Sequence, residues 1–199
     1  MLEHRKLYGP KLIAFQEYLT NLNLKITEDD ILEWLKMYRR FPYKSHHGQP
    51  SIEMINNLGG KELSILMDSD GYLDFNLFKK YYDLGYAFII SDILDYNKQT
   101  REIEQIAYEM VGARIAGNFY FSHGGGEQAP SLKLHTDAYD IFVKTVYGIS
   151  HWVIGDKKIK STDQQVHYVP PEVLHGVYSV PEPRLSLVLG CYSSSNIPK

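Results

Sequence analysis

The chain has 199 residues, and its 21 Lys and Arg against 24 Asp and Glu give a formal charge of −3 with every histidine neutral. This balance excludes a strongly basic nucleic-acid-binding protein, because phosphate contacts need an excess of cations. A chain of this length buries roughly 70% of its unfolded surface, which is enough for a single domain with its own core. The single cysteine, Cys191, excludes an intramolecular disulfide framework, and the first residues contain no apolar signal segment, so we expect a cytoplasmic protein.

The first part of the chain has helical patterns. Residues 11–22 place apolar side chains at steps of three and four, which predicts a helix with one apolar face. Thr27 and Asp30 resemble a capping box and predict a second helix that starts there. Residues 51–60 and 74–85 are also predicted to form short helices, each ended by glycine.

Beyond residue 85 the pattern changes to strands. Residues 86–91 form a compact apolar run typical of a strand, and residues 98–112 form an amphipathic helical stretch. Further strands are predicted, separated by turn-forming residues, over residues 113–121, 138–148, 150–156, 164–170, 175–180 and 184–192.

This order of elements predicts a mainly β protein, a barrel or sandwich with helices packed outside it. We expect one domain over residues 1–199. In it, residues 1–85 form a helical N-terminal part that braces the sheet, and residues 86–199 form the strand-rich catalytic core.

The segment LKLHTDAYD contains a candidate metal site. His135 and Asp137 lie two residues apart on extended chain, so both side chains project from the same face and can share one ion. His175, about forty residues further on, would complete the set of two histidines and one carboxylate that holds non-haem Fe(II) and leaves three coordination positions open. The alternatives are that His135 and Asp137 are an exposed strand-end pair, that His175 only ends a turn, or that His167 takes its place.

The context of these residues resembles a known family. Residues 118–184 contain NFYF, a glycine-rich loop HGGGEQAPS, then LHTDAYDIFVKTVYGISHWVI and VHYVPPEVLHGVYS. This series is similar to the cupin-like Jumonji-type, or JmjC-related, branch of the Fe(II)/2-oxoglutarate-dependent oxygenases. The resemblance implies a double-stranded β-helix, also called a jelly roll, with Fe(II) held by His135, Asp137 and His175 and with 2-oxoglutarate as co-substrate.

One position departs from that branch. A Lys or Arg just after the strand glycine commonly binds the far carboxylate of 2-oxoglutarate there, whereas this chain has Ser150. Another branch places that cation in an Arg-x-Ser motif after the last metal ligand, and Arg184 and Ser186 match it. Arg pairs bidentately with carboxylates. By the superfamily's N-x-Y pattern, Asn118 and Tyr120 would contribute a further donor, so we expect these four residues to bind the co-substrate.

Other readings of these residues stay open. Arg184 could be a surface strand residue in a salt bridge. His151 could bind the co-substrate, although a partly buried imidazole beside a tryptophan is the simpler interpretation. His46, His47 and His123 are interpreted as solvated loop histidines and not as ligands.

The resemblance implies an oxygenase that hydroxylates a C–H bond of a small molecule or of a protein side chain. Asp137 occupies a position that related halogenases leave vacant, which favours hydroxylation. Duplex nucleic acid and membranes are not expected as partners, because the charge is nearly neutral and no apolar run reaches the ~18 residues of a bilayer span; a homodimer is compatible with the extra helices. The alternatives are a cupin metalloenzyme that does not use 2-oxoglutarate, and a non-catalytic β-helix that acts as a binding module.

Overall fold

The computed structural model describes residues 2–37, 51–56, 59–62, 66–112, 114–125 and 132–192. His46 and His47 lie outside these ranges. The helices are α1 (Leu2–Asn21), α2 (Glu28–Met37), α3 (Phe75–Asp83), the 3-10 turn η2 (Ile93–Asp95) and α4 (Lys98–Val111). The strands are β1 (Ile52–Ile55), β2 (Lys61–Glu62), β3 (Ala87–Ser91), β4 (Arg114–Ser122), β5 (Asp140–Tyr147), β6 (Ser150–Ile154), β7 (Lys157–Ser161), β8 (Val166–Val169), β9 (His175–Ser179) and β10 (Arg184–Tyr192).

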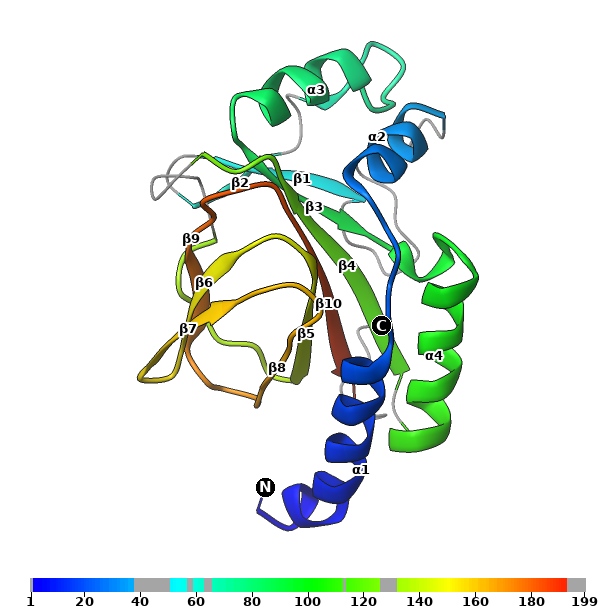
Figure 1. The fold of residues 1–199 in the computed structure, drawn as a ribbon, viewed down its shortest axis with the longest axis vertical. Helices are drawn as coiled ribbons and strands as arrows, with labels where there is room; N and C mark the ends of the chain where they lie inside the picture. Colours follow the sequence, from blue (N-terminus) through cyan, green and yellow to red (C-terminus); the bar gives the residue numbers. More distant parts are fainter. Residues whose placement is uncertain are drawn as a thin grey trace.

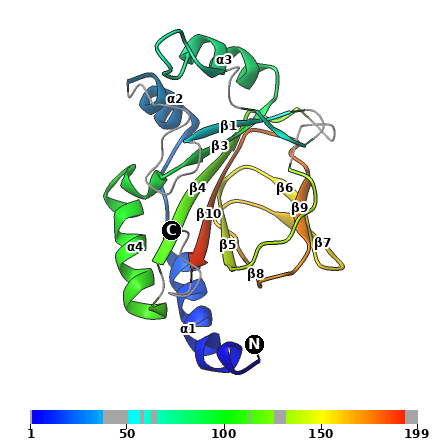
Figure 2. The same ribbon diagram turned by 180° about the vertical axis from the view of Figure 1, so that it is seen from behind.

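The strands form two antiparallel sheets that face each other. Within the described ranges, seven strands make one sheet in the order β2-β1-β3-β4-β10-β5-β8, and three make a second in the order β7-β6-β9. The small sheet lies across from the long strands β10 and β5, while α1 and α4 lie on the other side of the large sheet (Figures 1 and 2). Two facing antiparallel sheets with this strand content form a jelly roll. The predicted fold, a double-stranded β-helix with flanking N-terminal helices, is therefore confirmed.

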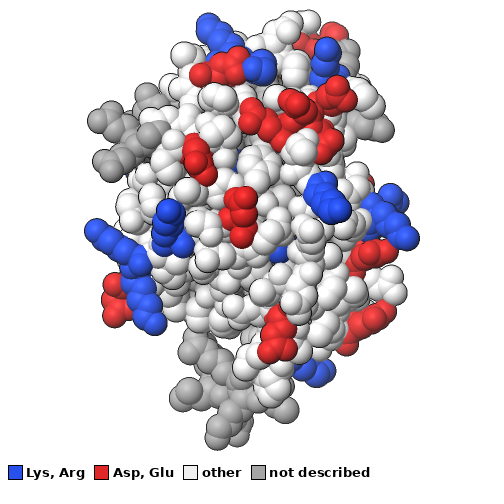
Figure 3. Space-filling model, viewed as in Figure 1, with Lys and Arg blue, Asp and Glu red and all other residues white. Residues whose placement is uncertain are grey.

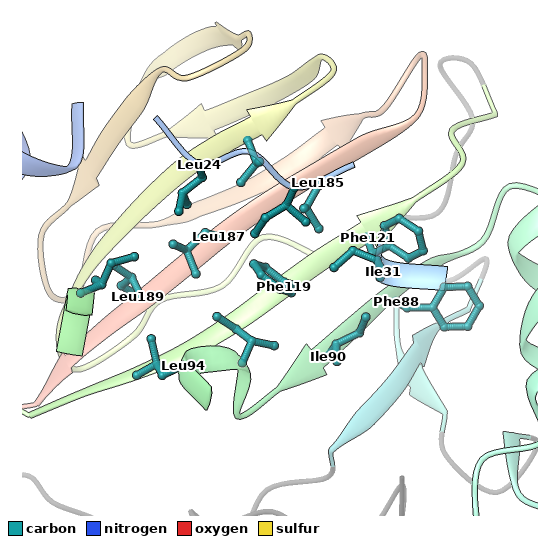
Figure 4. Close-up of a cluster of buried hydrophobic side chains, with 14 of the residues drawn as sticks. Leu24, Ile31, Phe88, Ile90, Leu94, Phe119, Phe121, Leu185, Leu187 and Leu189 are labelled. Carbon is teal, nitrogen blue, oxygen red and sulfur yellow. The ribbon is translucent and has the colours of Figure 1, made fainter. Parts of the chain in front are cut away.

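Alternation along the central strand β10 separates the core from the interior of the barrel. Leu185, Leu187 and Leu189 are fully buried and pack toward the helices, together with Phe119 and Phe121 of β4 (Figure 4). Because successive side chains on a strand point to opposite faces, the residues between these leucines point into the barrel. The main hydrophobic core thus lies outside the barrel, and the barrel interior remains available for polar groups.

Short-range hydrogen bonds set where the helices begin. Thr27 donates its backbone N–H to Asp30 Oδ2 at 2.8 Å, and Asp30 N–H donates to Thr27 Oγ1 at 3.2 Å, which confirms the predicted capping box. Asn97 and Thr100 cap α4 in the same reciprocal way. Both boxes satisfy backbone N–H groups that a helix leaves without partners in its first turn.

A buried lysine fastens the end of α1 to the large sheet. Lys144 on β5 points outward from the barrel and is fully buried. Its Nζ donates to the carbonyl oxygens of Leu19 at 2.9 Å and Gln164 at 3.2 Å. Leu19 belongs to the last turn of α1, where helix carbonyls lack intrahelical partners and a cation is favourable. This contact helps to explain how α1 packs against β5 and β8.

One predicted element is wrong, and strands β2 and β7 were not predicted. The helix predicted over residues 51–60 is wrong, because residues 52–55 form β1, which pairs with β3 and is buried throughout. Strand β7 was not predicted, because most of its residues are exposed lysines. Since β1 and β2 join the large sheet, the N-terminal part contributes strands as well as helices; the division at residue 85 stays a prediction.

The surface carries both signs of charge. On the face shown in Figure 3, Lys and Arg side chains are interspersed with Asp and Glu. No helix in the described ranges is both long enough and apolar enough to cross a bilayer. The expectation that duplex nucleic acid is not a partner stays a prediction.

Candidate metal centre

The backbone brings two distant histidines together. His135 lies in the segment that leads into β5, and His175 is the first residue of β9. They form an antiparallel bridge, in which His135 N–H donates to His175 O at 3.0 Å and His175 N–H donates to His135 O at 2.8 Å. A second backbone bond, from Glu172 N–H to Asp137 O at 2.7 Å, holds Asp137 beside the same turn.

The side chains of the predicted triad converge. Asp137 Oδ2 lies 3.4 Å from His135 Nε2 and 3.3 Å from His175 Nε2. One potential ligand atom from each residue lies within 4.8 Å of the others. The His175 side chain is 5% exposed and that of His135 is 39% exposed, so the cluster is closed on one side and open on the other. This is the geometry of a site that one ion can enter.

The tautomer of each imidazole is set by a backbone carbonyl. His135 Nδ1 lies 2.9 Å from Lys133 O, and His175 Nδ1 lies 2.9 Å from Val173 O. A carbonyl oxygen accepts hydrogen bonds, so each neutral ring carries its proton on Nδ1 and turns the lone pair of Nε2 toward Asp137. Metal-binding histidines are oriented in this way by a partner on the second nitrogen. The donor set therefore fits a divalent metal.

The charges of the three side chains also suit metal binding. The pKa of Asp137 lies well below its usual range, because its carboxylate accepts hydrogen bonds from His135 and then from His175 whenever Nε2 of each ring carries a proton. Hydrogen bonding to Asp137 raises the pKa of His135, although burial acts in the opposite direction. Asp137 is thus ionised at neutral pH, which is the form that binds a metal. His135 must be neutral to bind, so protons compete with the metal for this nitrogen.

A cavity of about 400 Å³ extends from the triad into the barrel. One part of its wall is apolar and includes Val143, Val188 and Trp152. Another part is polar and contains the predicted residues Asn118 and Tyr120. The wall also contains the following residues: Glu53, Lys61, Lys133, Tyr139, Arg184 and Tyr192.

Arg184 is a buried cation that faces this cavity. It is 2% exposed, and its Nε and Nη1 have no hydrogen-bond partner among the described residues. Burial lowers the pKa of Arg184 to about 10, which still leaves it charged at neutral pH. The hydroxyl of Ser186, on the same face of β10, likewise has no partner there. Tyr120 lies directly opposite Ser186 on β4, so the structure brings these predicted residues together.

A buried guanidinium that is unpaired among the described residues is costly, since an ion without a counter-charge loses its hydration. A carboxylate bound in the cavity would supply the missing charge and acceptors. The surface salt bridge considered for Arg184 is excluded by its burial. The residues present therefore fit a dicarboxylate as well as a metal.

The three other histidines whose side chains the structure describes, His123, His151 and His167, lie apart from the triad. His167 Nε2 lies 2.9 Å from Ser161 Oγ, so this nitrogen is already engaged away from the metal ligands. The ring of His151 stacks on Tyr178 with centroids 5.7 Å apart, outside the cavity lining. His123 packs against the ring of Tyr82, as part of the helix contacts.

Sequence reasoning missed several cavity residues. Tyr139 hydrogen bonds with Tyr192 and lies beside Asp137. Both tyrosines could have been found by their spacing, because Tyr139 lies two residues after Asp137 and Tyr192 an even number after Arg184, on extended chain. Glu53 gave no such signal, since residues 51–60 were predicted as a helix, and Lys61 lies just beyond that segment.

The fold is shared with structures of known proteins. Two structures of YcfD, a ribosomal oxygenase from Escherichia coli, match with a TM-score of 0.58 and 17% identity over 87% of this chain and 45% of that chain. A structure of YcfD in complex with cobalt and 2-oxoglutarate matches with a TM-score of 0.57 and 16% identity, with the same coverage. The chain spans under half the length of those proteins. No family model matches the chain, and no curated protein matches it.

Proposed function

We propose that this protein is an Fe(II)- and 2-oxoglutarate-dependent oxygenase that hydroxylates a C–H bond of a small molecule or of a protein side chain. The proposal rests on two features that occur together in one cavity. A cluster of two imidazoles and one carboxylate shares its cavity with Arg184, a buried cation that has no counter-ion among the described residues. A structural metal site would not need Arg184, and a binding module would not need the triad.

The residues take distinct roles in this proposal. His135, Asp137 and His175 hold the metal through Nε2 atoms and a carboxylate oxygen. Arg184 holds the far carboxylate of 2-oxoglutarate, and Ser186 and Tyr120 donate further hydrogen bonds to it. Asn118, two residues before Tyr120 on the same face of β4, lines the path between these groups.

Iron with 2-oxoglutarate supplies the chemistry of dioxygen activation, in which the co-substrate is converted to succinate and carbon dioxide. The protein contributes orientation and a dry environment. The apolar wall of Val143, Val188 and Trp152 excludes water from the reacting C–H bond, and the fixed tautomers of both histidines keep the ligand geometry rigid.

The structural neighbours support the proposal without deciding the substrate. YcfD is described as a ribosomal oxygenase and has been solved with cobalt and 2-oxoglutarate. A protein side chain is therefore one of the two substrate classes that we propose. A cytoplasmic location and a homodimer stay predictions. The closest competing function is a cupin metalloenzyme without 2-oxoglutarate, which would leave Arg184 unexplained.

The test is succinate formation by the purified protein with Fe(II), 2-oxoglutarate and oxygen. We expect His135→Ala to abolish it. His151→Ala is the matched control, since that imidazole lies outside the cavity, and it should retain the activity of the unmodified protein. Succinate formation that survives in His135→Ala, or that does not depend on 2-oxoglutarate and iron in the unmodified protein, contradicts the proposal.

A further inference from the structure

The cavity wall also contains a pair of oppositely charged residues, which has no role in the proposed binding of metal and co-substrate. Glu53 lies on β1 and Lys61 on β2, and both line the same cavity as the metal triad. Lys61 Nζ lies 2.9 Å from Glu53 Oε2. The Glu53 side chain is 7% exposed, whereas that of Lys61 is 45% exposed. One partner is therefore fixed in the wall and the other reaches solvent.

The register of the large sheet places Glu53 in line with the co-substrate residues. Glu53 pairs with Ile89, Ile89 pairs with Tyr120, and Tyr120 pairs with Ser186. Residues directly opposite each other across neighbouring strands share a face. Glu53 thus faces the same cavity as Tyr120, at the far end of this row from Ser186. Burial, followed by the charges of Asp137 and Glu53, raises the pKa of Tyr120, as expected for two carboxylates near one phenol.

The pair is poorly explained as a stabilising contact. Burying a carboxylate is costly, and a half-exposed lysine offsets little of this cost, since exposed ion pairs contribute little to stability. The neighbouring cavity-facing positions Ile55 and Ile89 are apolar, so an apolar residue could also form this wall. Lys61, moreover, donates to Oε2 of Glu53 and not to Oε1. A carboxylate in the cavity wall with one oxygen not engaged by Lys61 is suited to bind a cation.

We propose that Glu53 binds a positively charged amine or guanidine of the prime substrate, and that Lys61 is the displaceable partner that occupies the carboxylate otherwise. The inference rests on the proposed function for the reaction itself. Lys61 can leave the pair, because its long flexible side chain already reaches solvent. A guanidine or amine that takes its place keeps the charge of the cavity balanced and supplies donors to both carboxylate oxygens.

A neutral or acidic substrate fits this wall less well. A neutral group gives Glu53 no counter-charge if Lys61 is displaced, and an acidic group adds a third carboxylate to those of Asp137 and Glu53. The cationic group could come from a free amine or from a basic side chain in a peptide. Both sources share the same chemistry, and separate arms of one experiment distinguish them.

The experiment measures binding without turnover, on protein loaded with Zn(II) and 2-oxoglutarate. Isothermal titration is carried out with agmatine as the free guanidine and with the peptide Gly-Gly-Arg-Gly-Gly as the side-chain source. The peptide with citrulline in place of arginine is the neutral isostere. We expect saturable binding of agmatine, of the arginine peptide, or of both. The citrulline peptide should bind about tenfold or more weakly than the arginine peptide. The tighter of the two cations identifies the source of the cationic group.

Two variants act in opposite directions. Glu53→Gln keeps the shape but loses the charge, and should weaken cation binding about tenfold or more. Lys61→Met removes the competing cation and should strengthen it several-fold, which keeps the test informative if Glu53→Gln folds poorly. Glu102→Gln, in an exposed helical ion pair with Lys98, is the matched control and should bind as the unmodified protein does.

Three results overturn the inference: no saturable cation binding, equal binding by Glu53→Gln and the unmodified protein, or weakened binding by Lys61→Met. Failure of the proposed function has a different signature, because the unmodified protein would then lack metal binding and 2-oxoglutarate-dependent succinate formation. If those two activities are present while cation binding fails, the inference alone is wrong.

Discussion

At the residue scale, the candidate site depends on small local contacts that fix each side chain. Both histidines of the triad direct Nδ1 to the carbonyl oxygen of the residue two positions earlier. The same local geometry, repeated in two segments about forty residues apart, presents two Nε2 atoms to Asp137. The ligand orientation is therefore built into the backbone before any metal binds.

Replacing Arg184 separates co-substrate binding from stability. Arg184→Met should weaken 2-oxoglutarate binding about tenfold or more with little change in metal affinity, because the guanidinium holds the far carboxylate and does not contact the triad. Its thermal stability should be equal or higher, since a buried cation that has no counter-ion in the described part of the chain is replaced by an apolar group of similar length. Isothermal titration and thermal unfolding measure the two effects. An unchanged 2-oxoglutarate affinity would move the anchor to another residue.

Part of the site was predictable from the sequence, because two residues that lie two positions apart on an extended chain point to the same face. His135 and Asp137 follow this rule directly, and Arg184 and Ser186 follow it on β10. The selection of His175 over His167 came from the resemblance, and spacing alone left it open. Glu53 could not be found, because its place in the cavity depends on pairing between β1 and β3, which no local pattern encodes.

At the element scale, one glycine allows two strand connections to approach each other. Gly148 follows β5 with φ +82°, and a Cβ there would lie 2.0 Å from Pro183 O and 2.9 Å from Arg184 Cα. Its backbone N–H donates to Asp163 Oδ1 at 2.7 Å. The turn after β5 is thus packed against the residue that starts β10 and carries the guanidinium.

Gly148→Ala should therefore affect both stability and the co-substrate. The positive φ and the backbone clash together should cost about 2–4 kcal/mol of unfolding free energy, and the shift of Arg184 should weaken 2-oxoglutarate binding. Gly112→Ala is the control, since it also has a positive φ but meets no atom within 4 Å. Chemical denaturation compares the two. Equal losses in both variants would show that the close approach to Arg184 is unimportant.

Lys144 predicts a pH dependence of stability. Burial lowers its pKa from 10.5 to about 8. Below pH 8 both the folded and unfolded chains carry the proton, and the burial penalty is fully present. Between about pH 8 and 10.5 the unfolded chain binds more protons, so the free energy of unfolding gains a contribution that rises with pH, on the order of 1–3 kcal/mol.

The measurement compares unfolding at pH 7.5 and pH 10 in the unmodified protein and in Lys144→Met. We expect the variant to lack this rising contribution, while Lys160→Met, which removes an exposed lysine, keeps it. If Lys144→Met shows the same pH dependence as the unmodified protein, Lys144 is charged in the fold at pH 10.

The elements themselves were largely predictable, with informative exceptions. The helices predicted over residues 11–22, from residue 27, and over residues 74–85 and 98–112 have apolar side chains spaced with the helical period, and a helix is confirmed in each place. The segment that forms β1 is short and buried on both faces, so its apolar residues fit either period, and its pairing with β3 decides the outcome.

At the scale of the whole molecule, the proposed metal would join the two sheets. His135 lies at the entry to β5 of the large sheet, and His175 starts β9 of the small sheet. A metal that binds the folded chain and not the unfolded one stabilises it by about 2.7 kcal/mol at a free concentration one hundred times the Kd. The order of helical and strand patterns was sufficient to predict a barrel or sandwich with helices outside it, and the double-stranded β-helix followed from the resemblance. The extension of the large sheet by β1 and β2 was not predictable in this way.

Metal-dependent thermal unfolding tests this coupling. Co(II) added without oxygen should raise the Tm of the unmodified protein by several degrees and leave Asp137→Ala unchanged. The effect should diminish on acidification, since the pKa of His135 is raised and its proton competes with the metal. A Tm increase of the same size in Asp137→Ala would place the stabilising metal elsewhere.

The most direct test of the account is a crystal structure of the protein grown without oxygen in the presence of Fe(II) and a non-reactive 2-oxoglutarate analogue. The account predicts an anomalous iron peak in contact with His135 Nε2, Asp137 Oδ2 and His175 Nε2, and a carboxylate of the analogue on the guanidinium of Arg184. An iron peak away from these three atoms, or an analogue bound without contact to Arg184, would contradict it.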